Sequence, residues 1–309
     1  MNALPAVLLA LRVLIVGSPD SHESTEAYRR ALASTGLYEV AVVEDASLVS
    51  TAVVSKYDAV LLNARAAHAV GRKVLLAKPE AGMAKMMADV ARVTGASPTA
   101  ATKSAPLRVL VVTGGHDYDP SFDSVFEGYT DVRVTVDPHP KAYNRDLLKS
   151  FDVLVLYDMI DTLTDMQRRN LTNFLEAGRG VVVLHHALCS YNGQDWWKQV
   201  TGGQYEQKKS TYLHDRDYTA KRVADHPVTA GLPAQWSVHD ETYKGMNYAE
   251  GNKVLVTTDD ATGDGPLVWI STYSKSRVVS IQTGHNRESH YDPIYRRLVH
   301  NAMIWAGGR

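Results

Sequence analysis

The stretch Gly178-Arg-Gly-Val-Val-Val-Leu-His-His-Ala187 decides the fold that the sequence predicts. Its four apolar residues follow a glycine and end directly in His185 and His186. An uninterrupted, largely β-branched run of this kind is typical of a strand buried on both faces, as in a parallel sheet. Ligands of open α/β sheets bind beyond the carboxyl ends of such strands. We therefore expect the two histidines to lie at a functional edge, with hydrogen-bonded loop residues as the alternative interpretation.

Length and composition narrow the class of protein. At roughly 100–200 residues per domain, a chain of 309 residues suggests two domains. The net charge of -1 argues against nucleic acid or a membrane surface as a partner. A single cysteine excludes an internal disulfide framework. The apolar N-terminus lacks a basic region and a clear cleavage site, and no apolar run approaches the roughly 18 residues of a membrane span. We expect a cytoplasmic protein.

The first hundred residues alternate strand and helix patterns. Strands are expected at residues 11–17, 38–43 and 57–62, a further strand and turn at 71–80, and a helix at 81–93, which together predict a small parallel α/β domain. No Gly-x-Gly-x-x-Gly follows the first strand, where the pyrophosphate of NAD would bind. NAD is therefore not expected, and a helper or interface domain is the preferred interpretation of residues 1–95. The composition of residues 96–106 is typical of a linker.

The pattern restarts at Leu107. Leu107-Arg-Val-Leu-Val-Val-Thr-Gly-Gly115 nearly repeats Leu11-Arg-Val-Leu-Ile-Val-Gly-Ser18, and residues 151–156 resemble residues 57–62. Two related α/β domains in tandem, with the second at 107–309, would explain the repeat; convergence of buried strands is the alternative. Within the second domain, Thr164-Asp-Met-Gln167 predicts the start of a helix that ends near Gly178.

Ten of the twelve histidines lie at or after His116, so polar chemistry is expected in the second domain. His116 follows its first strand, and His285 follows its last. His214 lies in a long polar segment, residues 206–218, which the sequence predicts as a functional loop. Asp240 and Glu241 are expected in a second loop over the same edge. His226, before a proline, is expected to be a structural turn residue.

Several landmarks in this order resemble the trehalose-utilisation (ThuA-like) family. They are Gly114-Gly-His-Asp117, Val183-Leu-His185, Trp196-Trp197 with Gly202-Gly-Gln-Tyr205, His226-Pro-Val-Thr-Ala-Gly-Leu-Pro233, Asp240-Glu-Thr-Tyr243, and Gly284-His285 before a terminal helix with Trp305-Ala306. The resemblance covers residues 107–309. It implies a flavodoxin-like three-layer αβα sandwich with a parallel sheet, similar to class I glutamine amidotransferase domains. It also implies carbohydrate catabolism, acting on a disaccharide such as trehalose or on a 3-keto derivative that a sugar 3-dehydrogenase produces.

Amidotransferases of that class carry a nucleophilic cysteine at a strand-to-helix elbow. Here His185 stands at that corner, and Cys189 lies four residues beyond it. Cys189 is therefore expected to be a small buried residue, and thiol amidotransfer is not expected. A keto-glycoside hydrolase, lyase or isomerase is the preferred class of enzyme.

The site is expected to combine imidazoles with carboxylates. The expected catalytic residues are His116, His185, Asp240, Glu241 and His285. The expected substrate-binding residues are Asp117, His186, Trp196, Tyr205, His214, Tyr243 and Asn286.

Two chemical interpretations remain open for these residues. In one, a divalent metal, zinc or manganese, is held by ligands drawn from His116, His185, His214 and His285. In the other, an imidazole and a carboxylate move a proton next to a keto group. A non-catalytic sugar-binding or scaffold module and an NAD-dependent sugar dehydrogenase are the alternatives of a different class. A homo-oligomer is compatible with the tandem domains.

Overall fold

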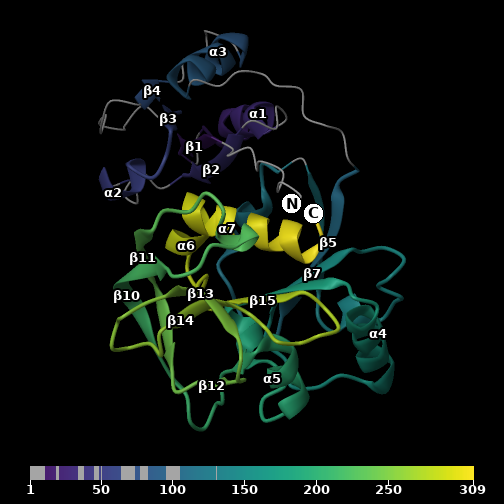
Figure 1. Ribbon diagram of the computed structural model, residues 1–309. Helices are drawn as coiled ribbons and strands as arrows, with labels where there is room; N and C mark the ends of the chain where they lie inside the picture. The colour runs from purple at the N-terminus through teal and green to yellow at the C-terminus, as the bar shows by residue number, and fades with distance from the viewer. Residues whose placement is uncertain are drawn as a thin grey trace, which may run out of the picture. The chain divides into compact units, whose positions relative to one another are not determined.

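The computed structural model describes residues 11–18, 21–33, 38–44, 49, 51–63, 74–76, 83–94, 105–129 and 131–309 (Figure 1). The chain divides into two compact units. Unit 1 comprises Met1–Ala105, Asp123–Asp131 and Tyr291–Arg296, and unit 2 comprises Pro106–Phe122, Val132–His290 and Arg297–Arg309. Most of the predicted linker, up to residue 104, and the N-terminal ten residues lie outside the described residues. Among the helices that are described, none has the length and apolarity needed to cross a membrane.

Unit 1 contains a four-stranded parallel sheet in the order β2-β1-β3-β4. Its strands are β1 (Leu11–Val16), β2 (Tyr38–Val43), β3 (Ala59–Leu62) and β4 (Val74–Leu76). Its helices are α1 (His22–Ala33), α2 (Thr51–Val54) and α3 (Met83–Thr94). Val13 and Ile15 are fully buried in one core cluster with Leu32 of α1 and Val90 of α3, whereas Leu14 belongs to a second cluster. This division is the expected consequence of side chains alternating between the two faces of a strand.

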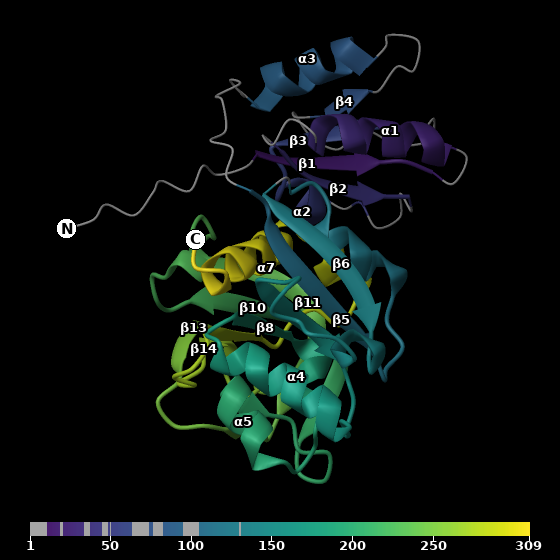
Figure 2. The ribbon, with the colours of Figure 1, turned by 90° about the vertical axis from the view of Figure 1, so that its right-hand side faces the viewer.

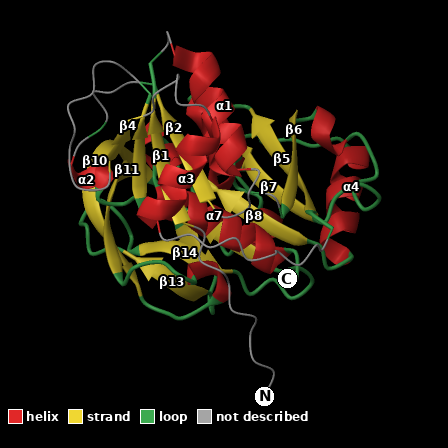
Figure 3. Ribbon diagram, turned by 90° about the horizontal axis from the view of Figure 1, so that it is seen from above, coloured by secondary structure: helices red, strands yellow, loops and turns green. Residues whose placement is uncertain are grey.

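Unit 2 is built on a nine-stranded mixed sheet in the order β11-β10-β13-β14-β15-β8-β7-β5-β6. Five neighbouring strands are parallel: β5 (Leu107–Gly114), β6 (Val132–Pro138), β7 (Val153–Asp158), β8 (Gly180–Leu184) and β15 (Val278–Ile281). Four antiparallel strands extend the sheet beyond β15: β10 (Thr211–Arg222), β11 (Gln235–Lys244), β13 (Lys253–Thr257) and β14 (Pro266–Ile270). Figure 3 shows these antiparallel strands on the opposite side of the sheet from β5 and β6. The parallel sheet that the sequence predicts is therefore one end of a larger mixed sheet, with β6 at its edge.

Helices cover both faces of this sheet. Figure 2 shows α4 (Asp165–Glu176) and α5 (Asp195–Thr201) on one side and α7 (Pro293–Ala306) on the other. Leu154, Val181 and Val183 face α4 and α5 in one buried cluster that includes Phe174 and Trp197. Because full burial of a Val, Leu or Phe side chain contributes roughly 1.5–3 kcal/mol, this two-sided core fixes β8 and the residues that follow it.

The remaining elements are short. They are η4 (Pro120–Phe126), η5 (Lys141–Tyr143), η6 (His185–Cys189), η7 (Pro227–Thr229), α6 (Arg287–Tyr291) and the two-residue strands β9 (Gly203–Gln204) and β12 (Asn247–Tyr248). The predicted start of α4 is confirmed, because the Thr164 hydroxyl accepts a hydrogen bond from the Gln167 backbone while the Gln167 side chain accepts one from the Thr164 backbone. His226 caps η7 through a bond from the Val228 N–H to its Nδ1, which confirms its structural role.

The two units share a strand order. In each, the first strand pairs in parallel with the second on one side and with the third on the other. The same arginine–aspartate contact occurs at the start of both first strands. The Arg12 backbone N–H donates to the Asp58 carboxylate at 2.8 Å, and the Arg108 backbone N–H donates to the Asp152 carboxylate at 3.0 Å. In each pair the two side chains also form a salt bridge. This common order and contact fit the tandem relationship that the sequence repeat predicts.

We expect Gly180→Ala to lower the free energy of unfolding by about 1–3 kcal/mol, because the new methyl group has no space. A Cβ at residue 180 would lie 2.2 Å from the carbonyl oxygen of Ala306 in α7, so backbone must move. Gly263→Ala is the matched control, since its nearest neighbour would be the Thr258 methyl group at an ordinary 3.6 Å. Urea denaturation of both variants measures the difference, and equal midpoints would show that β8 and α7 are not so closely packed.

Candidate functional site

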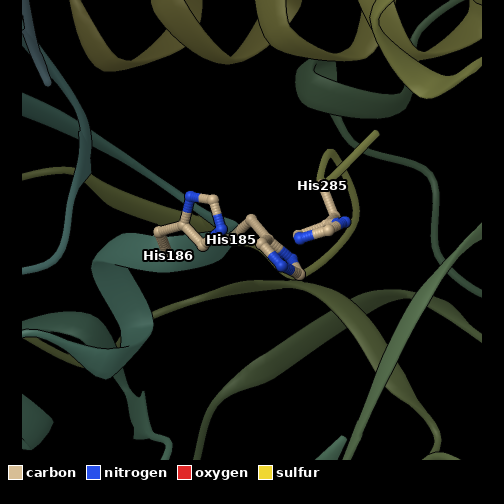
Figure 4. A group of neighbouring side chains, drawn as sticks. All are labelled: His185, His186 and His285. Carbon is tan, nitrogen blue, oxygen red and sulfur yellow. The ribbon is translucent and has the colours of Figure 1, made fainter. Parts of the chain in front are cut away.

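The site begins where β8 ends. Leu184 is the last residue of the strand, and His185 opens η6 with a backbone φ of 33°. A left-handed conformation is unfavourable for a residue with a Cβ and is commonly kept at functional turns. Both histidines that follow the strand are buried, His185 completely and His186 to 3% exposure. Figure 4 shows His185 between His186 on one side and His285 on the other.

Glu241 of β11 connects three imidazoles through its two carboxylate oxygens. Its Oε1 lies 3.2 Å from Nε2 of His185. Its Oε2 lies 2.5 Å from Nδ1 of His214 and 3.9 Å from Nε2 of His285. The carboxylate is almost fully buried, whereas the His214 side chain is 52% exposed and that of His285 is 26% exposed. A buried negative charge therefore lies beneath two imidazoles that reach solvent.

His185 and Glu241 favour each other's charged forms. Burial opposes a charge on His185, but the hydrogen bond and charge of Glu241 raise its pKa above the ordinary value. Burial likewise opposes ionisation of Glu241, yet the hydrogen bond and charge of His185 lower the pKa of the carboxyl group. Nδ1 of His185 donates to the Gln282 carbonyl oxygen at 2.5 Å. This bond fixes the orientation of the ring, so that Nε2 faces Glu241 and lies 2.8 Å from the Tyr243 hydroxyl oxygen.

The imidazoles form a row at the carboxyl ends of β5, β8 and β15. The ring of His116 stacks on His186 with centroids 4.1 Å apart, and the ring of His285 contacts His186 at 5.4 Å and His214 at 5.0 Å. His116 is exposed, and its Nδ1 lies 2.5 Å from the Asp117 carbonyl oxygen. Because only an N–H can donate to a carbonyl, this contact places a proton on Nδ1 and leaves Nε2 as the nitrogen that faces away from Asp117.

Desolvation keeps two members of the row neutral. Burial, together with the neighbouring imidazoles, lowers the pKa of His186 far below its ordinary value. Burial and the charge of His185 also lower the pKa of His285, although Glu241 opposes this shift. Neither of the buried ring nitrogens of His186 has a hydrogen-bond partner among the residues that the structure describes. Neutral imidazoles offer lone pairs, which accept protons or bind metal ions.

Asp240 holds the backbone at His285. Its Oδ1 accepts hydrogen bonds from the backbone N–H groups of Glu241 at 2.8 Å and His285 at 3.0 Å. Its Oδ2 accepts from the Gly284 N–H at 2.5 Å and the Ser289 hydroxyl at 2.6 Å. Gly284 has a φ of 113°, which a side chain would disfavour. Through these four donors, the fully buried Asp240 positions the backbone of His285, and its predicted catalytic role stays a prediction.

We expect Asp240→Asn to cost about 2–4 kcal/mol of stability, because an amide has one acceptor oxygen for four buried donors. Asp259→Asn is the control: its carboxylate is 74% exposed and pairs with Lys221 at the surface, so its replacement should change stability by less than about 0.5 kcal/mol. Thermal unfolding of both variants gives the comparison. If Asp240→Asn lowered the stability no more than the control does, the loop that carries His285 would not depend on this carboxylate.

The structure corrects the expected loops over the site. His214 lies on strand β10, and Asp240 and Glu241 lie on strand β11, which pairs with β10 in antiparallel register. A β-bulge interrupts this pairing between Leu213 and Arg216, where Asp215 has a φ of 51°. Bulges redirect side chains next to active sites. The site is therefore framed by strands on this side, and the bulge lies beside His214.

The other residues predicted for substrate binding have structural contacts of their own. The Trp196 indole N–H donates to Gln194, and the Arg168 guanidinium lies 4.2 Å from the centre of its ring. The hydroxyl of buried Tyr205 donates to the Ser210 carbonyl. Asn286 donates to the His239 carbonyl and accepts from the Ser289 N–H. Asp117 is exposed beside His116. Of the aromatic residues predicted here, Tyr243 reaches the imidazoles directly.

Three contributors are not singled out by the sequence. Tyr157 at the end of β7 lies 4.8 Å from the His186 ring, and its hydroxyl donates to the Gly284 carbonyl at 2.8 Å. His290 of α6 lies 3.0 Å from the same carbonyl, and burial lowers its pKa to about 4. Tyr212 is 53% exposed and its ring lies 5.0 Å from that of His214. The position of Tyr157 at a strand's carboxyl end is a signal that could have identified it.

Cys189 does not have the environment of a nucleophile. It is buried, and burial raises its thiol pKa to about 12. Nucleophilic thiols require a lowered pKa and access to substrate. The prediction of a small buried residue is confirmed.

Comparisons with known proteins agree with this architecture. The family model described as trehalose utilisation, ThuA, matches residues 108–306. A ThuA-like protein from Parabacteroides merdae ATCC 43184 has a similar structure, with a TM-score of 0.55, 18% identity, and coverage of 66% of this chain and 90% of that chain. Another, from Bacteroides uniformis ATCC 8492, gives a TM-score of 0.52, 20% identity, and coverage of 68% and 95%. At these identities the likeness concerns the fold, and no curated protein matches. With the family model covering most of its length, the chain belongs to the trehalose-utilisation (ThuA) family.

Proposed function

We propose that this chain is an enzyme of carbohydrate catabolism that moves a proton on a trehalose-like disaccharide carrying a 3-keto group. Membership of its family suggests a role in trehalose utilisation. The observation that supports catalysis is that two imidazoles that reach solvent, His214 and His285, lie beside the buried carboxylate of Glu241. The exposed ring of His116 stacks on His186, which contacts His285 in turn. Such a set can accept and donate protons on both sides of a neutral sugar.

The proposed reaction uses the acidity next to a ketone. Nε2 of His116 takes the C2 proton, and the electron pair of the C2–H bond moves toward C3 to form an enolate. The electrons return to break the C1–O bond, and the released oxygen takes a proton from solvent water. The products are a free sugar and an unsaturated keto sugar, to which water can add. Protonation of the enolate at C2 from the opposite face instead gives the C2 epimer of the keto sugar.

Two features suit a sugar substrate. Tyr212 presents an exposed ring beside His214, where the flat face of a pyranose could stack. The imidazoles supply donors and acceptors for hydroxyl groups. The 3-keto group must come from an oxidation at C3, so a sugar 3-dehydrogenase would supply the substrate.

Turnover of 3-keto-trehalose and of trehalose, followed by mass spectrometry, tests the proposal. We expect consumption of the keto sugar and a loss of about 10²–10⁴-fold in kcat for His116→Gln, the range for a removed general base. His239→Gln is the control, since that partly exposed imidazole pairs with Asp217 instead of Glu241. A wild-type protein that binds the sugar without consuming it would replace the enzyme with a sugar-binding module.

A further inference from the structure

The surroundings of Glu241 contain more imidazoles than a carboxylate needs. Oε1 already has a charged partner in fully buried His185. Oε2 nevertheless faces two further ring nitrogens, Nδ1 of His214 and Nε2 of His285. Imidazole nitrogens and carboxylate oxygens are ligand atoms that zinc binds in proteins, and here three of them converge on one place.

The three atoms have the spacing of metal ligands. His214, Glu241 and His285 each offer one ligand atom, and these three atoms all lie within 4.8 Å of one another. Oε2 of Glu241 lies 2.5 Å from Nδ1 of His214 and 3.9 Å from Nε2 of His285. Atoms bound to one zinc ion at roughly 2.0–2.2 Å stand about 3–3.5 Å apart, so small side-chain movements would complete the geometry. Two histidines and one carboxylate leave positions free for water or substrate, as in catalytic sites.

The neighbouring structure orients each of these groups. His185 holds the other oxygen of Glu241 at 3.2 Å. Asp240 holds the backbone N–H of His285 at 3.0 Å. The bulge after Leu213 lies next to His214 on β10. Outer partners of this kind fix the direction of metal ligands and are a regular feature of metal sites.

We propose that His214, Glu241 and His285 bind one divalent metal ion of the zinc or manganese type, with coordination positions open to the substrate. This assignment keeps two of the four histidines that the sequence offers as ligands and replaces His116 and His185 by a carboxylate. A second triad, His185, His186 and His285, has the same spacing. It is the weaker candidate because both nitrogens of His185 already have partners, the Gln282 carbonyl on one side and Glu241 with Tyr243 on the other.

The role of the ion rests on the proposed function, whereas its binding does not. Bound between His214 and His285, it would polarise the keto oxygen and stabilise the enolate charge. His116, outside the ligand set, would remain free to take the C2 proton.

Calorimetric titration of Zn²⁺ and Mn²⁺ into the chelator-treated full chain tests the site. We expect one ion per chain for the wild type and at least about 100-fold weaker binding for His214→Ala, which removes a ligand at a half-exposed position without opening the core. His239→Ala on the neighbouring strand is the matched control and should bind like the wild type. His186→Ala should also bind like the wild type.

The outcomes separate the two proposals. No stoichiometric binding by the wild type, or loss of binding in His186→Ala with retention in His214→Ala, would overturn the assignment of ligands. Binding as expected with no turnover of a keto sugar would leave the metal site in place and remove the proposed reaction. Turnover that survives complete removal of the metal would support the proton-transfer proposal and overturn the catalytic role of the ion.

Discussion

Replacing Glu241 by glutamine is expected to lower kcat/KM for 3-keto-trehalose by about 10³–10⁴-fold. The amide keeps the size of the side chain but removes the negative charge that lies between His185, His214 and His285. The imidazoles would lose their common partner, and the proposed metal ion would lose its anionic ligand. Steady-state assays of both proteins, with circular dichroism to verify folding, measure the effect.

Glu176→Gln is the control for this change. Glu176 is half-exposed on α4 and pairs with Lys275 at the surface, so its replacement should leave kcat/KM unchanged. A Glu241→Gln protein that folds and retains wild-type activity would exclude the cluster as the catalytic centre.

Replacing His185 by alanine is expected to lower the free energy of unfolding by about 3–5 kcal/mol, because it leaves the buried carboxylate of Glu241 without its main partner. Adding Glu241→Gln to this variant should restore part of the loss, since the unpaired charge is then gone. The coupling between the two sites, measured by urea unfolding of all four proteins, should be about 1–3 kcal/mol.

The pH at which this coupling is measured follows from the two pKa shifts. The pKa of His185 is higher in the folded protein than in the unfolded chain, where it is about 6.5. Its contribution to stability is therefore complete below roughly pH 6.5 and is lost as the pH rises through the pKa of the folded protein. The lowered pKa of Glu241 gives stability that is complete above about 4.3 and is lost as pH falls through the folded value. The coupling should therefore be largest near pH 5–6, about midway. If the two substitutions changed the free energy of unfolding additively at this pH, with a chelator present, His185 and Glu241 would not form an ionised pair.

The sequence predicts the parallel part of the fold because its signals are local and strong. Residues 181–184 are all fully buried, as an uninterrupted apolar run implies, and the helix before them begins at the predicted capping box. Strand ends also identify His116, His185 and His285, since the carboxyl ends of parallel strands share one edge. The same rule, applied to Tyr157, would have added one more residue.

The antiparallel strands could not be predicted in the same way. Residues 211–217 of β10 are all exposed, so they lack the apolar alternation that marks a half-buried strand. Their pairing with β11 depends on backbone contacts between distant segments. The sequence also could not distinguish the roles of Asp240 and Glu241. Neighbouring residues of a strand point to opposite faces of the sheet, and only the folded structure shows which of the two carboxylates contacts the imidazoles.

Aromatic residue type predicted the site less well than position at the end of a strand did. The adjacent tryptophans suggest a sugar platform, but Trp197 is fully buried in the core and Trp196 packs against Tyr191 and Arg168. Large apolar rings in a folded domain are usually part of its core. Tyr212, in a segment without apolar periodicity, is the exposed ring beside the site.

Deuterium uptake at C2 of 3-keto-trehalose in heavy water, followed by proton NMR, tests the central claim most directly. Wild-type protein is expected to place deuterium at C2 of recovered substrate or of product faster than buffer does, and His116→Gln is expected to slow this exchange toward the buffer rate. If recovered sugar and any product both retain the C2 proton while the sugar binds, no proton is moved at this carbon, and the account of an enzyme acting by proton transfer is wrong.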